Sequence, residues 1–147
     1  MSDLPVMLQE FFQISNIKEL LFAFVIALPI GWNREKESRS MGLRTFPLVA
    51  VASCGYMLIG SSVVDGDPDA LSKLLYGLMT GIGFIGGGAI LKDGASVQGT
   101  ATAASIWNTG AVGAAVAFHR YEIAVVLAVI SFMILSLAKP IKNTLSD

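Results

Sequence analysis

Residues 45–64 form an unbroken run of twenty residues without Asp, Glu, Lys, Arg or His. A helix that crosses the hydrocarbon core of a bilayer needs about 20 apolar residues, and a helix satisfies its own backbone hydrogen bonds there. The whole chain is 54% hydrophobic and only 14% charged, whereas soluble domains carry about 25% charged residues. The sequence therefore predicts an integral membrane protein.

Four further apolar segments accompany this run, and the segments that connect them are short. Short connections favour antiparallel packing of neighbouring helices. The pattern predicts an all-α fold in which residues 1–147 form a single transmembrane domain with five transmembrane helices. The expected spans are 16–33, 45–64, 74–91, 95–118 and 121–138. The mixed segment 4–14 is expected to lie along the membrane interface.

Basic residues are distributed unevenly between the two sides of this predicted bundle. Lys and Arg are retained preferentially on the cytoplasmic side of a membrane. Seven of the ten basic residues fall on one side, namely Arg34, Lys36, Arg39, Arg44, Lys92, Lys139 and Lys142. The other side has Lys18, Lys73 and Arg120, beside Asp65, Asp67 and Asp69. The distribution predicts an N-terminus outside and a C-terminus in the cytoplasm.

Few residues are available for chemistry. Cys54 is the only cysteine and His119 is the only histidine, so neither an intrachain disulfide nor a Cys/His zinc cluster can form. No nucleophile can be paired with a base from this set. We therefore expect no enzyme, no bound metal and no cofactor. The net charge of −1 also gives no general attraction for nucleic acid.

The glycine-rich segment 81–86 spells GxGxxG, which is the fingerprint of dinucleotide-binding sites. That motif works after a strand of a soluble sheet, and here it lies inside an apolar run. Spacing of small residues favours close helix packing instead. A broken helix beside a polar cavity, at 86–88, is the alternative. The glycines expected to pack are Gly77, Gly81, Gly83, Gly87, Gly99 and Gly110.

The corner between the first two predicted spans carries candidate functional residues. Asn33 and Arg34 end the first span, and Arg44 and Thr45 begin the second. Free amide groups at a helix N-terminus favour anions, so Arg44 is placed to bind a phosphate, a carboxylate or an anionic lipid headgroup. The alternative is that these basic residues only hold the loop on the cytoplasmic side.

The fourth predicted span is the most polar one. Thr102, Ser105 and Thr109 recur at helical spacing, so they share one face. This face either forms hydrogen bonds to neighbouring helices or lines a water-filled pathway. Trp107 and Asn108 lie among these residues and are further candidates.

The loop that precedes this span, 92–99, is predicted to be a tight turn. Asp93 and Ser96 are its candidate functional residues. In a transporter, Asp93 and Arg44 would lie at the cytoplasmic mouth of the pathway.

Taken together, these residues resemble the MgtC/SapB family of bacterial inner-membrane proteins. The resemblance rests on Gly31 and Arg34, on GLRT at 42–45, on GIGFIGGGAI at 81–90 with KDG at 92–94, and on Gly99 with TAASIW at 102–107. These motifs occur in the family's order and spacing. Asn33 departs from the pattern, because a glutamate commonly stands there, and Asn108 stands where some members have cysteine.

The resemblance implies five membrane spans in the inner membrane. It also implies a link to survival at low magnesium, to virulence inside macrophages and to modulation of the ATP synthase. Many relatives continue into a soluble C-terminal domain, so the resemblance implies a short form with the membrane domain only.

Two functions follow as hypotheses. The first is a regulator of another membrane complex, linked to magnesium homeostasis and to virulence or stress survival. The second is a subunit of an oligomeric channel or transporter for a cation or small solute, with a polar pathway along the fourth helix. Five short spans enclose little volume, so we expect a homo-oligomer in the lipid bilayer, with a homodimer as the default.

Overall fold

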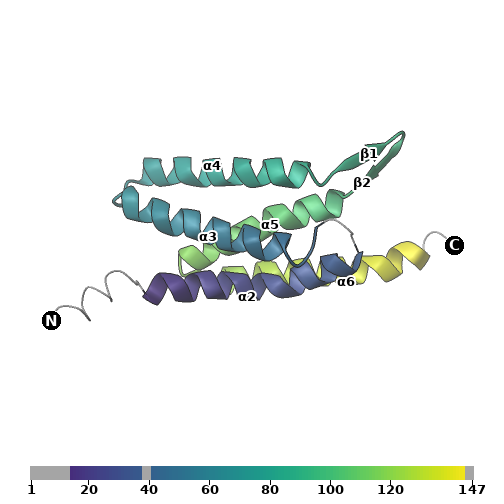
Figure 1. Cartoon of the computed structure of the whole chain (residues 1–147), viewed down its shortest axis with the longest axis horizontal. Helices are drawn as coiled ribbons and strands as arrows, with labels where there is room; N and C mark the ends of the chain where they lie inside the picture. The colour runs from purple at the N-terminus through teal and green to yellow at the C-terminus, as the bar shows by residue number, and fades with distance from the viewer. Residues whose placement is uncertain (1–13, 38–40, 145–147) are drawn as a thin grey trace.

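The structure of the protein is a computed structural model, and it describes residues 14–37 and 41–144. Successive helices run antiparallel to one another (Figure 1). Of the predicted interfacial segment 4–14, only Ile14 lies within the described residues. The elements, in chain order, are α2 (Ile14–Glu37), α3 (Thr45–Val63), α4 (Pro68–Gly87), β1 (Leu91–Asp93), β2 (Ser96–Gln98), α5 (Thr100–Ala117) and α6 (Tyr121–Thr144).

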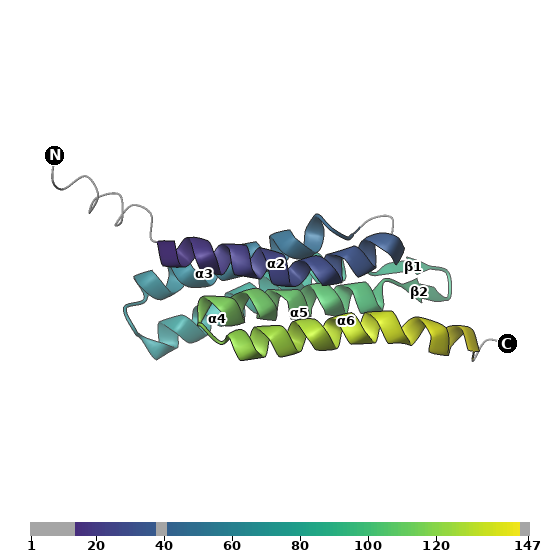
Figure 2. The ribbon, with the colours of Figure 1, turned by 90° about the horizontal axis from the view of Figure 1, so that it is seen from below.

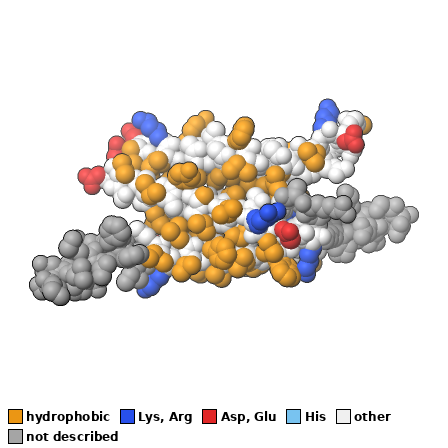
Figure 3. All heavy atoms as spheres, in the orientation of Figure 1, with side chains coloured by type: hydrophobic (Ala, Val, Ile, Leu, Met, Phe, Trp, Pro, Cys, Tyr) orange, Lys and Arg blue, Asp and Glu red, His pale blue; other side chains and the backbone are white. Residues whose placement is uncertain are grey.

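Three stretches of helix are long and apolar enough to cross a membrane, namely Ser15–Lys36, Thr45–Val63 and Pro68–Gly87. Tyr121–Leu137 is a shorter apolar helix, and α5 has 18 residues with several polar side chains. Hydrophobic side chains cover the middle of the visible face, and charged side chains gather toward its two ends (Figure 3). This arrangement agrees with the prediction of an all-helical membrane protein.

The predicted boundaries of the third and fourth spans, 74–91 and 95–118, are wrong. Helix α4 begins at Pro68, because Asp67 caps it by accepting a hydrogen bond from the backbone N–H of Asp69 at 2.9 Å, and proline is well suited to the first position of a helix. Helix α4 ends at Gly87, and α5 begins only at Thr100.

The residues between α4 and α5 form an antiparallel β-hairpin rather than the ends of two helices. Leu91 pairs with Gln98, and Asp93 pairs with Ser96. Gly94 has a φ of +56°, a backbone conformation that glycine adopts at little cost and that a tight hairpin turn requires. Apolar Leu91 and Val97 had extended the predicted helices into this hairpin, because hydropathy does not distinguish a short strand from a helix end.

Helix α5 lies at the centre of the bundle, with α2 on one side and α6 on the other (Figure 2). Its buried residues are Thr102, Ser105, Ile106, Thr109, Gly110, Val112, Gly113, Val116 and Ala117. Helix α3 packs closely on it, because a Cβ on Gly113 would overlap the carbonyl oxygen of Ala50. Small residues at such contacts let backbones approach closely, as is usual for membrane helices.

Candidate functional site: a buried polar cluster among helices α2, α5 and α6

Arg34 and Thr102 form a hydrogen bond between the last turns of α2 and the first turn of α5. Nη2 of Arg34 donates to Oγ1 of Thr102 at 3.0 Å, and the two residues are 9% and 5% exposed. A charged group in this environment is costly unless it is hydrogen-bonded. Both residues were candidates from the sequence, and the fold brings them together although they are 68 positions apart in the chain.

Asn33 and Asn108 connect the same two helices to α6. Nδ2 of Asn33 donates to Oγ of Ser136 at 3.0 Å. Nδ2 of Asn108 donates to Oγ of Ser131 at 2.5 Å and to the carbonyl oxygen of Leu127 at 3.2 Å. We call Asn33, Arg34, Thr102, Asn108, Ser131 and Ser136 the polar cluster. It joins three helices that are distant in the sequence.

One acceptor in this cluster is unused. Oδ1 of Asn33 is buried and has no hydrogen-bond partner among the described residues. A buried amide oxygen without a donor is unfavourable by about 1–3 kcal/mol, so this atom is the point at which the cluster can accept a hydrogen bond from a water or a ligand. Asn33 is also where the sequence departs from the family pattern.

Ser105 and Thr109 lie on the buried face of α5 but bond within their own helix. The hydroxyl of Ser105 donates to the carbonyl oxygen of Ala101 at 2.7 Å, and that of Thr109 donates to the carbonyl oxygen of Ser105 at 2.8 Å. Such bonds to the preceding turn are common for Ser and Thr inside helices. In this structure, the polar face predicted for the fourth span is packed against its neighbours.

The other candidate residues lie outside the cluster. Arg44 is exposed at the N-cap position of α3 and makes no capping hydrogen bond with its side chain, and Thr45 beside it is partly buried. Asp93 and Ser96 are exposed on the hairpin. Trp107 is on the outer surface of α5 and is 48% exposed.

Glu35, which was not among the candidates predicted from the sequence, holds the corner that carries Arg44. Oε2 of Glu35 accepts a hydrogen bond from the backbone N–H of Leu43 at 2.9 Å. A Cβ on Gly42 would overlap the Glu35 side chain, and a Cβ on Gly31 would lie 3.2 Å from the carbonyl oxygen of Gly42. The two glycines of the motif therefore permit close approach between the end of α2 and the loop before α3.

A second buried polar group, at the opposite end of the bundle, was also missed. Oε1 of Glu19 accepts a hydrogen bond from the hydroxyl of Tyr121 at 3.0 Å and lies 3.2 Å from Nδ1 of His119. Glu19 is only 4% exposed. The signal was in the sequence, because Glu19, Ala23, Ala27, Ile30 and Arg34 recur at helical spacing and all five are buried on one face of α2.

The glycines expected to pack have different surroundings. Gly110 contacts Ile82 of α4 closely enough that a Cβ would overlap it, whereas no atom from another part of the described chain lies within 4 Å of a Cβ position on Gly77, Gly81, Gly83 or Gly87. Gly99 is the N-cap residue of α5, with a φ of +83°, and not part of a contact between helices. The four α4 glycines thus have open space beside them, and their role in helix packing stays a prediction.

No group of three or more His, Cys, Asp or Glu side chains that could hold a metal ion occurs among residues 14–37 and 41–144. The fold and the polar cluster define a helical membrane protein whose bundle is joined by hydrogen bonds between buried side chains. The model of the MgtC family matches residues 20–144. The chain therefore belongs to the MgtC family.

Individual relatives agree with this assignment. The chain is 35% identical to the protein MgtC of Brucella abortus over 123 residues, which are 84% of this chain and 51% of that protein. It is 32% identical to MgtC of Salmonella typhimurium over 114 residues, 78% of this chain and 48% of that one. It is also 32% identical to the protein SrpB of Synechococcus elongatus over 130 residues, 80% of this chain and 71% of that one.

The chain thus spans about half the length of the two MgtC proteins that it matches. No solved structure matches it.

Proposed function

We propose that this chain is a multi-pass protein of the bacterial inner membrane, with five spans, the N-terminus outside and the C-terminus in the cytoplasm. The helices have 24, 19, 20, 18 and 24 residues, and each length falls within the range of about 17–25 residues that is usual for transmembrane helices. The end of α2, the start of α3 and the hairpin lie at the same end of the bundle (Figure 1), and these segments carry Arg34, Arg44 and Lys92. Their position supports placing that end inside.

Within the membrane, the protein acts as a regulator of another membrane complex and does not carry a solute itself. The observation that carries this proposal is the state of the polar side chains on α5. Thr102 and Asn108 are bonded to neighbouring helices, and Ser105 and Thr109 are bonded within α5. The side chains of Thr102 and Asn108 thus hold helices together, and the hydroxyl groups of Ser105 and Thr109 donate to their own helix and not to a hydrated ion.

The surface at the hairpin end is available for a partner. Arg44 and Lys92 are exposed there, and Arg44 lies at the N-terminus of α3, where backbone amide groups favour an anionic group. A partner with an acidic cytoplasmic loop fits this surface. The ATP synthase is the partner that the family resemblance suggests, and the process is magnesium homeostasis together with virulence or stress survival.

A homo-oligomer is part of this proposal. Gly83 and Gly87 are four positions apart on the exposed side of α4, and no atom of this chain lies within 4 Å of a Cβ position on either one. Two small residues at this spacing are typical of contacts between membrane helices. A second copy of the chain packed there would cover them.

A second function, a channel or transporter subunit, is favoured by one observation. Oδ1 of Asn33 is buried beside Arg34 without a hydrogen-bond partner among the described residues, as an acceptor along a closed polar pathway would be. In that case, the cluster would open during transport, and the bonds of Thr102 and Asn108 would break and re-form.

Two measurements on the full chain separate these functions. In liposomes that contain a magnesium-sensitive dye, the regulator gives the same influx as protein-free liposomes, whereas a transporter gives a higher rate that Asn108→Leu abolishes. In membranes, a regulator co-purifies with ATP synthase subunits. Arg44→Ala should lose this partner, and Lys92→Ala, at another exposed basic position of that end, should retain at least part of it. Influx above the protein-free rate, without co-purification, would contradict the regulator.

A further inference from the structure

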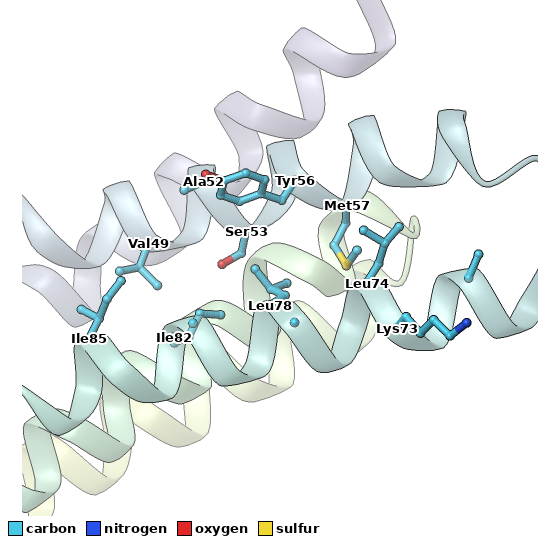
Figure 4. Close-up of a pocket in the computed structure, with 13 residues that line it drawn as sticks. Val49, Ala52, Ser53, Tyr56, Met57, Lys73, Leu74, Leu78, Ile82 and Ile85 are labelled. Carbon is cyan, nitrogen blue, oxygen red and sulfur yellow. The ribbon is translucent and has the colours of Figure 1, made fainter.

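A groove of about 680 Å³ lies between α3 and α4. Its walls are almost entirely apolar, and Figure 4 shows side chains from the two helices facing each other across it. Val49 and Met57 line it from α3, and Leu78 and Ile82 line it from α4. Lys73 is the only charged residue of the lining, and it lies toward the end where α4 begins.

The groove exists because α4 packs mainly on α5 and meets α3 at only a few places. Leu74 packs against Gly60 of α3, and Ile82 packs against Gly110 of α5. Between these contacts, Gly77 and Gly81 contribute no side chain to the groove, and nothing lies within 4 Å of a Cβ position on either. Larger residues at these two positions would fill the groove.

The size of the groove favours a thin occupant. It extends along α4 from Ala70 to Ile85, about 22 Å at 1.5 Å per residue. A packed helix is about 10 Å in diameter with its side chains. A single hydrocarbon chain is narrower, and the groove falls within the roughly 300–1,000 Å³ that is usual for small-molecule sites.

The charges at the Lys73 end indicate the headgroup. Lys73 provides an ammonium group for a phosphate, and Asp69, one helical turn away, provides a carboxylate for a cation. Both side chains are exposed, and they lie near the end of a helix that is long and apolar enough to span the membrane. The end of such a helix lies at the depth of the lipid headgroups. A headgroup that carries both a phosphate and an ammonium group complements this pair, whereas a purely anionic headgroup would approach Asp69 and Asp67 unfavourably.

We propose that the groove between α3 and α4 binds one acyl chain of a phosphatidylethanolamine molecule, with its phosphate at Lys73 and its ammonium group at Asp69. The bound lipid fills the space that Gly77 and Gly81 leave open and joins α4 to the rest of the bundle. This site depends on α3 and α4 spanning the membrane. It does not depend on whether the protein is a regulator or a transporter.

Native mass spectrometry of the purified full chain, titrated with phosphatidylethanolamine or phosphatidylglycerol, tests the proposal. We expect one tightly bound phosphatidylethanolamine per chain. The double substitution Gly77→Leu with Gly81→Leu should weaken its binding by about ten-fold or more. Lys73→Gln should weaken it by about two- to five-fold, as is usual for an exposed ion pair. The matched control Ser72→Leu, at an exposed position of α4 outside the lining of the groove, should bind as the unaltered chain does.

Other outcomes would overturn the proposal. Equal binding by the double variant and the unaltered chain would exclude the groove as the lipid site. Equal affinity for phosphatidylglycerol that Lys73→Gln does not change would exclude the headgroup assignment. A dimer that the double variant abolishes, without bound lipid, would assign the groove to a second copy of the chain. Lys73 is exposed, so its variant remains informative if the double variant does not fold. This experiment measures neither flux nor partner binding. Its result is therefore independent of whether the proposed function is correct.

Discussion

Nη2 of Arg34 donates a hydrogen bond to Oγ1 of Thr102, 3.0 Å away, and both side chains are buried. This bond joins the end of α2 to the start of α5 at the level of the polar cluster. A guanidinium group carries five N–H donors and cannot lose its charge in a protein. The acceptors around Arg34 therefore determine whether α2 can stay packed on α5.

Thr102→Val should destabilise the bundle by about 1–3 kcal/mol, which is the usual cost of removing a hydrogen bond to a charged group. Valine has the same shape as threonine but offers no acceptor to Arg34. The measurement is reversible unfolding in detergent micelles, followed by circular dichroism. Thr100→Val, at an exposed position in the same turn, is the control and should change stability by less than about 0.5 kcal/mol. Equal effects of the two substitutions would show that the Arg34 bond contributes nothing to stability.

Two glycine substitutions should change the stability of the protein in opposite directions. Gly113→Ala should destabilise by about 1–3 kcal/mol, because its Cβ would overlap the carbonyl oxygen of Ala50 and force α3 away from α5. Gly77→Ala should stabilise by about 0.5–1 kcal/mol, because its Cβ meets open space and alanine favours the helix. Unfolding in the same micelles measures both. A neutral or stabilising Gly113→Ala would contradict the close contact between α3 and α5.

Tyr121→Phe should destabilise the end of the bundle opposite the hairpin by about 1.5–3 kcal/mol. The Tyr121 hydroxyl donates to Oε1 of Glu19, whose other oxygen, Oε2, is buried without a hydrogen-bond partner among the described residues. In a Glu19→Gln background, Tyr121→Phe should destabilise the protein less. The buried group that loses the Tyr121 hydrogen bond is then a neutral amide and not a carboxylate.

Tyr76→Phe is the matched control for that substitution, because Tyr76 is 74% exposed on α4. It should leave stability within about 0.5 kcal/mol of the unaltered chain. If Tyr121→Phe and Tyr76→Phe unfold at the same detergent concentration, Glu19 does not depend on Tyr121.

Hydropathy predicted the helices well where a charge or a turn bounds them. The span predicted at 45–64 is Thr45–Val63 in the structure. Hydropathy did not predict the helix boundaries between α4 and α5, because Leu91 and Val97 extend the apolar pattern through a hairpin. The start of α4 could have been read from Asp67 and Pro68, which form a cap and a first turn.

The composition of the polar cluster was predictable in part. Asn33, Arg34, Thr102 and Asn108 stand out as polar residues within or beside apolar spans, and a polar residue in a membrane helix usually has a partner. Which partner it has depends on the rotation of each helix and on the order of neighbours in the bundle. Those features depend on packing between segments far apart in the sequence, so Ser131 and Ser136 could not be assigned from one sequence.

Labelling of single cysteines in intact cells tests the proposed topology most directly. In a Cys54→Ala background, Ser96→Cys lies on the exposed hairpin and Asp69→Cys lies on the exposed first turn of α4. We predict that a membrane-impermeant maleimide labels Asp69→Cys in intact cells and labels Ser96→Cys only after the inner membrane is opened. Labelling of Ser96→Cys in intact cells, or of both positions to the same extent, would contradict a bundle that spans the membrane with its arginine-bearing end inside.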